Sequence, residues 1–458
     1  MNENRKTLAF AAVAVVLVAL ALLFAPRRIT PDAFLDQGEP FFPEFTDPND
    51  ALTLEVIDFD ETTGSTQPFK VTFKDGLWTI PSHHNYPADA KDRLAKTAAG
   101  IIDIKKDDFR SDNVSDHEAC GVVDPLDEVT GLTGRGQRVT IKGRNDKVLA
   151  DLIIGHEVEN REGFRFVRIP DQKRVYTARM NIDLSTDFKD WIETDLLKVD
   201  KNKIDGVILK DYSINERTLS VDQRDNLVLD LKDGRWRANN MKSNQQIDST
   251  RMQDLMTAID DLTIVGVRPK PEGFSQGLKK SSGAQSISQS DVMSLQSKGF
   301  YITRDNQLLS NEGELQVHTN QGVNYTLRFG EVVYGSGLAV TAGVDEASNE
   351  SQNSASQNRY LFITTEFDEK AFPEPPQPKN TDFLKKPDSL WTDEDRENQA
   401  RQKEYEKWQR EVETGRQISR DLNARFADWY YVISAESFDK LHLKRQDLVV
   451  KKEPKKES

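Results

Sequence analysis

Two short runs contain residue types that could bind a metal or activate water. The run from His156 to Asn160 resembles the zinc-protease pattern H-E-x-x-H, but Asn160 stands where the second imidazole is needed. His117 and Cys120 have the spacing H-x-x-C, and the chain holds six histidines and one cysteine. A structural zinc site usually takes four His or Cys ligands. The sequence therefore predicts no metal site.

Glycine and serine patterns give no further chemistry. Gly134-Arg135-Gly136 and Gly335-Ser336-Gly337 lack both the G-x-G-x-x-G spacing and the Gly-Lys-Ser/Thr ending of phosphate-binding loops. No G-x-S-x-G nucleophile elbow occurs, and acidic pairs are expected by chance among 76 carboxylates. We therefore expect a non-catalytic protein without a cofactor.

Composition excludes one class of partner. The chain has 458 residues, with 62 Lys and Arg against 76 Asp and Glu, a formal net charge of −14. Binding to a phosphate backbone relies on clustered Lys and Arg, so we expect no nucleic-acid partner. The hydrophobic fraction of 36% suffices for packed cores, and the length allows two or three domains of roughly 100 to 200 residues.

The first thirty residues predict a membrane anchor. Leu8 to Ala25 is an uninterrupted apolar run with basic residues on both sides. At about 1.5 Å per residue, these eighteen residues nearly match a bilayer core of about 30 Å. A cleavable signal peptide is the alternative, although Pro26 is a poor residue after a cleavage site. We expect an uncleaved anchor over residues 1–30, with the N-terminus inside, followed by an extended, Pro-rich stalk over residues 31–50.

The rest of the chain repeats one pattern. The run K-D-G-x-W ends at Trp78 and recurs ending at Trp236, each time after alternating apolar residues typical of a strand. Asp-Gly predicts a hairpin turn at both places. The matching positions favour core packing of the two Trp side chains over a carbohydrate platform.

Each copy continues with a helix and further strands. Asp89 and Asp248 precede amphipathic helices, and strands ending at Gly155 and Gly330 follow later. We therefore predict an α+β fold, in which a transmembrane helix precedes two related, duplicated α+β units with antiparallel sheets. The units cover residues 51–203 and 204–450.

The second copy contains a long insertion. Phe164 to Ile169 turns directly into the next strand, whereas the matching pair, Tyr360 to Thr365 and Trp429 to Ile433, is separated by residues 366–428. This insertion starts with a Pro-rich run and continues as a helix whose start Thr392 and Asp395 predict by a capping-box-like spacing.

The apolar positions of this inserted helix follow spacings of three and four. They are Tyr405, Trp408, Val412, Leu422 and Phe426, with Gly415 and Ser419 in the same seam. The simplest interpretation is a helix packed on its own domain, and the sharper one is a docking or coiled-coil helix for a partner. We expect Tyr405, Trp408 and Val412 to bind the partner, and Leu422 and Phe426 to be buried.

Three other segments are too polar for a core. Residues 274–298 and 341–357 are predicted to be loop-like or disordered insertions in the second unit. The chain from Lys440 to Ser458 carries an excess of Lys and Arg, which indicates a solvated basic tail, assigned to residues 451–458.

The order of these motifs resembles the bacterial domain-of-unknown-function family numbered 4340. The resemblance rests on K-D-G-x-W before a capped helix and on the runs Gly121–Pro125, Leu152–Gly155 and Val175–Tyr176. The second half is similar to the longer, planctomycete-type members through Leu309–Leu315, Tyr325–Gly330 and Asp428–Ile433. The resemblance covers most of residues 50 to 450.

The resemblance implies a role in transport. Members are typically single-pass membrane proteins encoded beside an ABC-2 type permease, its ATPase and a gliding-motility-type auxiliary transport protein, and no catalytic or ligand residues are established for them. We therefore expect an extracytoplasmic accessory or scaffold protein of an ABC-type transport system, anchored in the cytoplasmic (inner) membrane with its bulk in the periplasm. A polysaccharide- or peptidoglycan-binding protein is the alternative, and an envelope hydrolase with an unrecognised site is less favoured.

Overall fold

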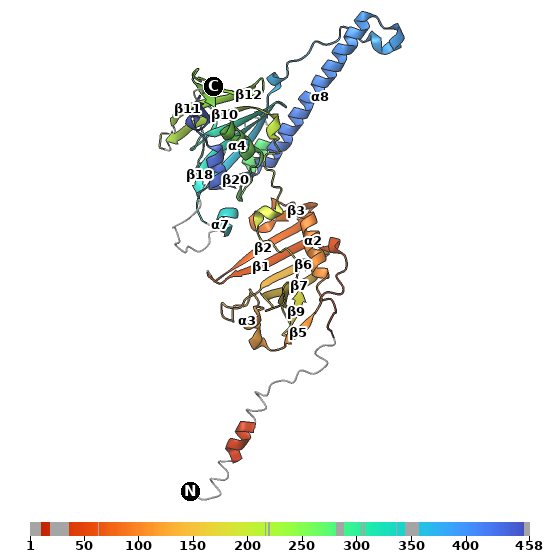
Figure 1. Ribbon diagram of the computed structural model, residues 1–458, viewed down its shortest axis with the longest axis vertical. Helices are drawn as coiled ribbons and strands as arrows, with labels where there is room; N and C mark the ends of the chain where they lie inside the picture. Colours follow the sequence, from red (N-terminus) through yellow and green to blue (C-terminus); the bar gives the residue numbers. More distant parts are fainter. Residues whose placement is uncertain are drawn as a thin grey trace, which may run out of the picture. The chain divides into compact units, whose positions relative to one another are not determined.

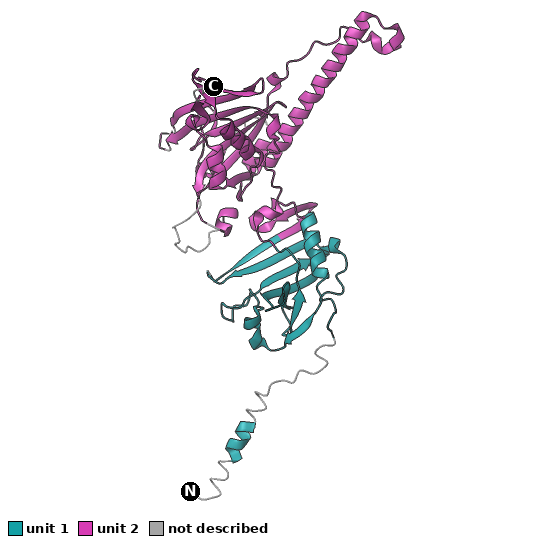
Figure 2. Ribbon diagram, viewed as in Figure 1, with its two compact units in different colours: residues 1–70, 91–184 teal, residues 71–90, 185–458 magenta. Residues whose placement is uncertain are grey.

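Strands and helices are described here for residues 11–18 and 36–452, except 63, 216, 219, 281–287, 304, 306, 336 and 344–356, in a computed structural model. In this part of the chain, two large antiparallel sheets and one long helix make an α+β fold (Figure 1). The chain divides into two compact units, residues 1–70 with 91–184 and residues 71–90 with 185–458 (Figure 2).

The first large sheet is built from antiparallel strands of very different lengths. They are β1 (Thr53–Asp60), β2 (Ser65–Lys74), β3 (Leu77–Ile80), β4 (Tyr86–Pro87), β5 (Asp108–Ser111), β6 (Gln137–Lys142), β7 (Val148–Glu157), β8 (Phe164–Arg168) and β9 (Val175–Arg179). Their order in the sheet is β4-β3-β2-β1-β6-β7-β8-β9-β5. Helix α2 (Lys91–Ile102) buries Leu94, Ala98 and Ile101, the apolar stripe that its sequence predicts, and α3 (His117–Cys120) is a single turn.

The second large sheet lies wholly in the second unit. Its strands are β10 (Ile204–Asn215), β11 (Ser220–Lys232), β12 (Arg235–Ala238), β14 (Gly266–Pro269), β17 (Glu314–Thr319), β18 (Val323–Val333), β19 (Asn358–Phe367) and β20 (Trp429–Ile433). Their order is β12-β11-β10-β17-β18-β19-β20-β14. Two small ribbons pair β13 (Gln245–Ile247) with β21 (Val449–Lys451), and β15 (Phe300–Ile302) with β16 (Leu308–Ser310).

Helices of the second unit connect and cover these strands. They are α4 (Ser249–Asp260), α5 (Glu272–Lys280), α6 (Gln289–Gln296), α7 (Gly337–Thr341), α8 (Asp393–Ala427), α9 (Ala435–Leu441) and α10 (Arg445–Leu448). Asp248 caps α4 as predicted, because its carboxylate accepts hydrogen bonds from the backbone amides of Thr250 and Arg251.

The two large sheets share one strand order. The series β3-β2-β1-β6-β7-β8-β9-β5 corresponds strand by strand to β12-β11-β10-β17-β18-β19-β20-β14. In each, an α-helix, α2 or α4, precedes the strand at the far edge. The K-D-G turns also match, since Asp75, Gly76, Asp233 and Gly234 all have positive φ, which a two-residue hairpin of this kind requires.

Trp78 and Trp236 occupy matching positions but are not core residues. Both are half-buried, and the apolar residues that precede the turns, Phe73 and Leu231, are exposed. The rings of Phe73 and Trp78 lie 5.2 Å apart, and Leu231 is opposite Trp236 in the β11–β12 register. The prediction of core packing is wrong because each Trp packs on its cross-strand neighbour beside the turn, where one side stays open to solvent.

The predicted stalk is in part packed on the first unit. Of residues 31–50, the structure describes 36–50, in which Phe41 and Phe45 are buried. Phe41 meets the ring of Tyr176 edge-on at 5.5 Å, and Lys106 pairs with Asp36 at 3.1 Å. Burying two aromatic side chains stabilises this attachment, so residues 36–50 are not a free extended spacer.

One segment predicted to be loop-like, residues 274–298, is partly folded, whereas most of the other, residues 341–357, lies outside the described residues. Within 274–298, the helices α5 and α6 flank the residues that are not described, and a capping box of Ser288 and Asp291 starts α6. Few but well-placed apolar residues anchor these helices, since Leu295 is buried in a cluster with Phe300, Phe362 and Tyr430. Near the C-terminus, α9, α10 and β21 carry the fold to residue 451, and residues 453–458 of the predicted basic tail lie outside the described residues.

The predicted membrane span lies mostly outside the described residues. Of Leu8 to Ala25, only residues 11–18 are described, and they are helical. No helix within the described ranges is both long enough and apolar enough to cross a bilayer.

Candidate partner-binding arm

The insertion between β19 and β20, residues 368–428, is here called the arm. Strands β19 and β20 are antiparallel neighbours, with Leu361 opposite Tyr431, as the sequence comparison of the two copies predicted. In the first sheet, the corresponding strands β8 and β9 are joined by residues 169–174 alone. Figure 1 shows α8 projecting away from the second sheet. The sheet thus closes without the arm in one copy and carries it in the other.

Helix α8 starts where the sequence predicts. Thr392 is the N-cap, and its hydroxyl accepts a hydrogen bond from the amide of Asp395, whose carboxylate accepts one from the amide of Thr392 in return. This amide, together with Lys386 and the Thr392 hydroxyl, lowers the pKa of Asp395 to about 2. The helix runs for 35 residues, which is about 50 Å at about 1.5 Å per residue.

The C-terminal part of α8, from Val412 onward, is packed against the second sheet. Val412, Gly415, Ser419, Leu422 and Phe426 are buried. A Cβ atom at Gly415 would lie 2.3 Å from the ring of Phe367 and 2.7 Å from the carbonyl oxygen of Gln321. The helix therefore lies flush on its own sheet at this residue.

Side-chain hydrogen bonds fix the same part of the helix to β19. Asn423 accepts from the amide of Thr365 at 2.9 Å and donates to its carbonyl oxygen at 2.6 Å, as a neighbouring strand would. The Thr365 hydroxyl donates to the carbonyl oxygen of Ser419 at 3.0 Å. These bonds hold α8 in one register on the sheet.

A buried lysine closes the C-terminal end of α8. Lys270 Nζ donates to the carbonyl oxygen of Phe426 at 2.9 Å and lies 3.9 Å from the ring centroid of Phe362. Burial lowers the pKa of Lys270 well below its ordinary value. Beside it, Asp428 accepts hydrogen bonds from Ser275 and Lys279 of α5. The part of the arm from Val412 to Asp428, called its root, is therefore joined to α5 and to the residue that follows β14, as well as to β19.

The middle of the arm holds the Pro-rich run against the helix. The Trp408 indole donates to the carbonyl oxygen of Phe372 at 2.9 Å, and Gln377 donates to the Tyr405 hydroxyl at 3.2 Å. The rings of Tyr405 and Trp408 are 5.3 Å apart, and both residues are half-buried. Asn398, about two helical turns before Tyr405, accepts a hydrogen bond from the amide of Lys379. The Pro-rich run, which leads from β19 to the far end of the arm, thus partly covers the aromatic face of α8.

The far end of the arm, residues 379–395, has a small core of its own and is called the tip. Two 3₁₀ turns, Asp382–Lys385 and Asp388–Leu390, flank it. Phe383 is buried and meets Trp391 edge-on, and the Trp391 indole donates to two backbone carbonyl oxygens at 3.1 Å. Leu384 and Leu390, in contrast, are 71% and 66% exposed. An organised tip therefore presents two apolar side chains to solvent.

The predicted partner-binding residues fall in different environments. Val412 is only 3% exposed and packs against its own unit, so its assignment to a partner surface is corrected. Tyr405 and Trp408 are partly covered by the Pro-rich run, and Leu422 and Phe426 are buried. Sequence reasoning missed Leu384 and Leu390. The available signal was the pairing of each leucine with an adjacent aromatic residue, Phe383 or Trp391, in a segment otherwise rich in polar residues.

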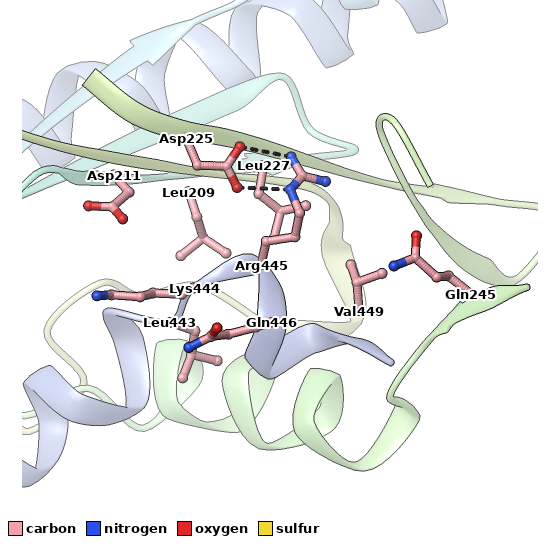
Figure 3. A pocket seen from close by; sticks show the side chains of 10 residues that line it. All are labelled: Leu209, Asp211, Asp225, Leu227, Gln245, Leu443, Lys444, Arg445, Gln446 and Val449. Atoms are coloured by element: carbon pink, nitrogen blue, oxygen red, sulfur yellow. Dashed lines mark hydrogen bonds and ion pairs between the residues drawn. The ribbon is translucent and has the colours of Figure 1, made fainter. Parts of the chain in front are cut away.

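A pocket of about 350 Å³ lies elsewhere in the second unit, between β10, β11 and the C-terminal segment (Figure 3). Leu209 and Leu227 line it from the sheet, and Arg445 from α10. Arg445 donates to both carboxylate oxygens of Asp225, at 2.8 and 3.0 Å, and to the carbonyl oxygen of Asn239 at 2.9 Å. These bonds attach the C-terminal segment to the sheet. The guanidinium of Arg445 is therefore already hydrogen-bonded within the protein.

In the part of the chain that the structure describes, histidine and cysteine side chains do not gather into a metal centre. Among the described residues, no group of three or more His, Cys, Asp or Glu could hold a metal ion. His117 donates to the carbonyl oxygen of Lys173 at 2.8 Å, and Cys120 is buried in an apolar cluster. His156 is exposed near the end of β7.

The fold and the arm define a two-sheet α+β protein with one inserted helical projection. Residues 78–280 of the chain match the family model of a domain of unknown function, DUF4340, and the match begins in β3 and ends with α5. This is the family that the motifs indicate, over a narrower range than residues 50 to 450. No curated protein and no solved structure matches the chain.

Proposed function

We propose that this protein is a membrane-anchored, extracytoplasmic accessory or scaffold subunit of an ABC-type, gliding-like transport system, and that the arm is its main partner-binding element. The apolar run at Leu8 to Ala25 supports the anchor, with the N-terminus inside and the bulk of the chain periplasmic. The resemblance to longer DUF4340 proteins supports an ABC permease and auxiliary transport subunits as partners. We propose no catalytic role.

The tip of the arm is the observation that carries the proposal. Exposed leucines on a segment held by Phe383 and Trp391 are apolar surface presented at a distance from the sheet. An inserted segment of this length is usually functional when it is ordered. The fixed root lets the arm act as a rigid extension of the second unit, which suits a scaffold that holds one partner at a set position.

The shared strand order of the two sheets supports a second part of the proposal. We infer that the two sheets arose by duplication and that the second copy gained the arm afterwards. The short β8–β9 connection at residues 169–174 is then the ancestral form, and the arm is the added element.

Removal of the distal arm tests the proposed function. A variant with residues 374–409 replaced by a short Gly-Ser turn keeps the buried root from Val412 onward and removes the tip. In affinity purification from detergent-solubilised membranes, we expect the full chain to retain ABC permease or ATPase subunits and the variant to lose them, with its melting temperature nearly unchanged. Leu384→Glu with Leu390→Glu should act in the same way, whereas Met293→Glu, at an exposed position of α6, should not. Retention of every transport subunit by a folded variant would contradict the proposal.

The matching Trp residues favour a second candidate, a binder of polysaccharide or peptidoglycan. Trp78 beside exposed Phe73, and Trp236 beside exposed Leu231, are half-open apolar surfaces of the kind that can stack on sugar rings. Co-sedimentation with purified peptidoglycan distinguishes this candidate. It predicts binding that Trp78→Ala and Trp236→Ala together abolish, and absence of binding by the unmodified chain rejects it.

A further inference from the structure

A pocket of about 390 Å³ in the first unit lies apart from the arm. It forms between the Gly121–Pro125 motif with its following loop and the β8–β9 turn. Arg168, the last residue of β8, lines this pocket although it is only 5% exposed. A guanidinium held at such a position is a fixed hydrogen-bond donor inside a concave surface.

Backbone carbonyl groups hold Arg168 in place from two sides. Its Nε donates to the carbonyl oxygen of Val122 at 2.9 Å, and its Nη1 donates to those of Pro170 and Gln172, the latter at 3.0 Å. No residue of the described chain accepts a hydrogen bond from its Nη2. Nη2 is not among the fully buried polar atoms that lack a partner, so water reaches it from the pocket. An acceptor supplied from outside would take the place of that water on a donor that is already held in position.

The charges around the pocket disfavour a strongly charged ligand. Arg138 pairs with Asp124 at 2.9 Å, and the side chain of Asp127 accepts the amide of Val129 at 2.8 Å. Asp171 and Lys173 are both exposed at the β8–β9 turn. Burial lowers the pKa values of Arg168 and His117, which also lines the pocket. An anion would face three aspartates, and a cation would face Arg168 and Lys173.

Two apolar side chains form the rim. Val114 and Leu126 are 53% and 49% exposed, and both line the pocket. They belong to segments before and after the Gly121–Pro125 motif. A fixed polar donor at the floor with apolar residues at the rim is the usual construction of a pocket that binds a molecule with one polar and one apolar part.

We propose that this pocket binds an uncharged peptide segment of a partner protein, whose main-chain carbonyl accepts a hydrogen bond from Arg168 and whose apolar side chain contacts Val114 and Leu126. A peptide supplies both groups within one residue and carries no net charge. This site is independent of the arm and does not require the proposed transport function.

Three leucine derivatives that differ only in charge test the proposal on the full chain in detergent. N-acetyl-leucinamide is neutral, N-acetyl-leucine is an anion and leucinamide is a cation, and saturation-transfer NMR reports contact with their methyl groups. We expect N-acetyl-leucinamide to bind best. The double variant Val114→Ser, Leu126→Ser should weaken its binding at least about fivefold, because the apolar contact is lost. The matched control is Val129→Ser, Leu132→Ser, at exposed positions of the same unit outside the pocket lining, and should leave binding unchanged.

Arg168→Lys tests the proposed hydrogen bond from the guanidinium to the ligand carbonyl, and the melting temperature shows whether the variant folds. This variant should also weaken binding, and the rim variants keep the test valid if it fails to fold. Stronger binding of the anion or the cation, equal losses in the rim and control variants, or no binding of any derivative at millimolar concentration would overturn the proposal. Preferential binding of methyl glucoside would overturn it too, in favour of a sugar.

Discussion

Lys270 illustrates how a single buried charge shapes the root of the arm. Its ammonium has aromatic rings and a helix-end carbonyl around it, and burial lowers its pKa. In the unfolded chain a lysine keeps its ordinary pKa of about 10.4, so over the range between the two values the unfolded state binds more protons. Stability therefore rises with pH through this range.

The first prediction follows from this proton balance. Between pH 7 and pH 9.5, the free energy of unfolding of the unmodified chain should rise more steeply than that of Lys270→Met. Chemical denaturation at both pH values measures the difference. Lys279→Met removes an exposed ammonium from the same region and should keep the slope of the unmodified chain. Equal pH dependence in the Lys270 variant would mean that the buried amine does not carry this effect.

The second prediction concerns the half-buried Trp residues. Trp78→Ala and Trp236→Ala should each lower the free energy of unfolding by about 1 to 2 kcal/mol, because only part of each ring is removed from water. Trp191→Ala, at a fully buried ring, should cost about 3 to 5 kcal/mol in the same denaturant titration. Equal costs at all three positions would show that Trp78 and Trp236 behave as core residues after all.

At the scale of elements, Gly415 decides how α8 meets the sheet. An added Cβ would collide with Phe367 and with the carbonyl oxygen of Gln321. Gly415→Ala should therefore destabilise the protein by about 1 to 3 kcal/mol, despite the better helix propensity of alanine. Gly273→Ala in α5, where a Cβ meets nothing within 4 Å, is the matched control and should be neutral or stabilising by about 0.5 kcal/mol. Thermal unfolding compares the two, and a stabilising Gly415→Ala would show that the helix is not seated flush.

The sequence could predict those elements whose signals are local. The K-D-G turns need positive φ that Asp and Gly accept, and Thr392 with Asp395 marks the start of α8. The paired strands on either side of the arm were predictable because the two copies share an apolar pattern.

The parts that could not be predicted depend on contacts between distant or aperiodic residues. Leu384 and Leu390 are exposed while Phe383 and Trp391 pack on each other. These residues are spaced by seven, but Pro387 lies between them, so the spacing does not show which side chains are covered. Val412 lies in the same helical seam as Tyr405 and Trp408, so the sequence cannot tell which end of the seam the sheet covers. Polar composition hid α5 and α6, whose few apolar residues pack on a cluster formed by far-off strands.

For the whole molecule, the proposed anchor is the feature that would set the compartment in which the two units function. Reporter fusions placed after residue 60 should be active only with a reporter that requires export, and the chain should stay with the membrane after a carbonate wash. The physical reason is the uninterrupted apolar run at Leu8 to Ala25, which matches a bilayer core in length. A mature chain that starts near residue 26, or activity of a cytoplasmic reporter, would contradict the anchor and its orientation.

The central claim is that the tip of the arm contacts a transport subunit, and photo-crosslinking in native membranes tests it most directly. A photo-reactive phenylalanine derivative is introduced separately at Leu384, at Leu390 and, as a control, at exposed Met293 of α6. We predict covalent adducts from both tip positions that contain an ABC permease, its ATPase or an auxiliary transport subunit, and none of these from Met293. If the tip positions of a folded, membrane-bound chain give no such adduct, or give the same adducts as Met293, the account of the arm as a partner-binding element is contradicted.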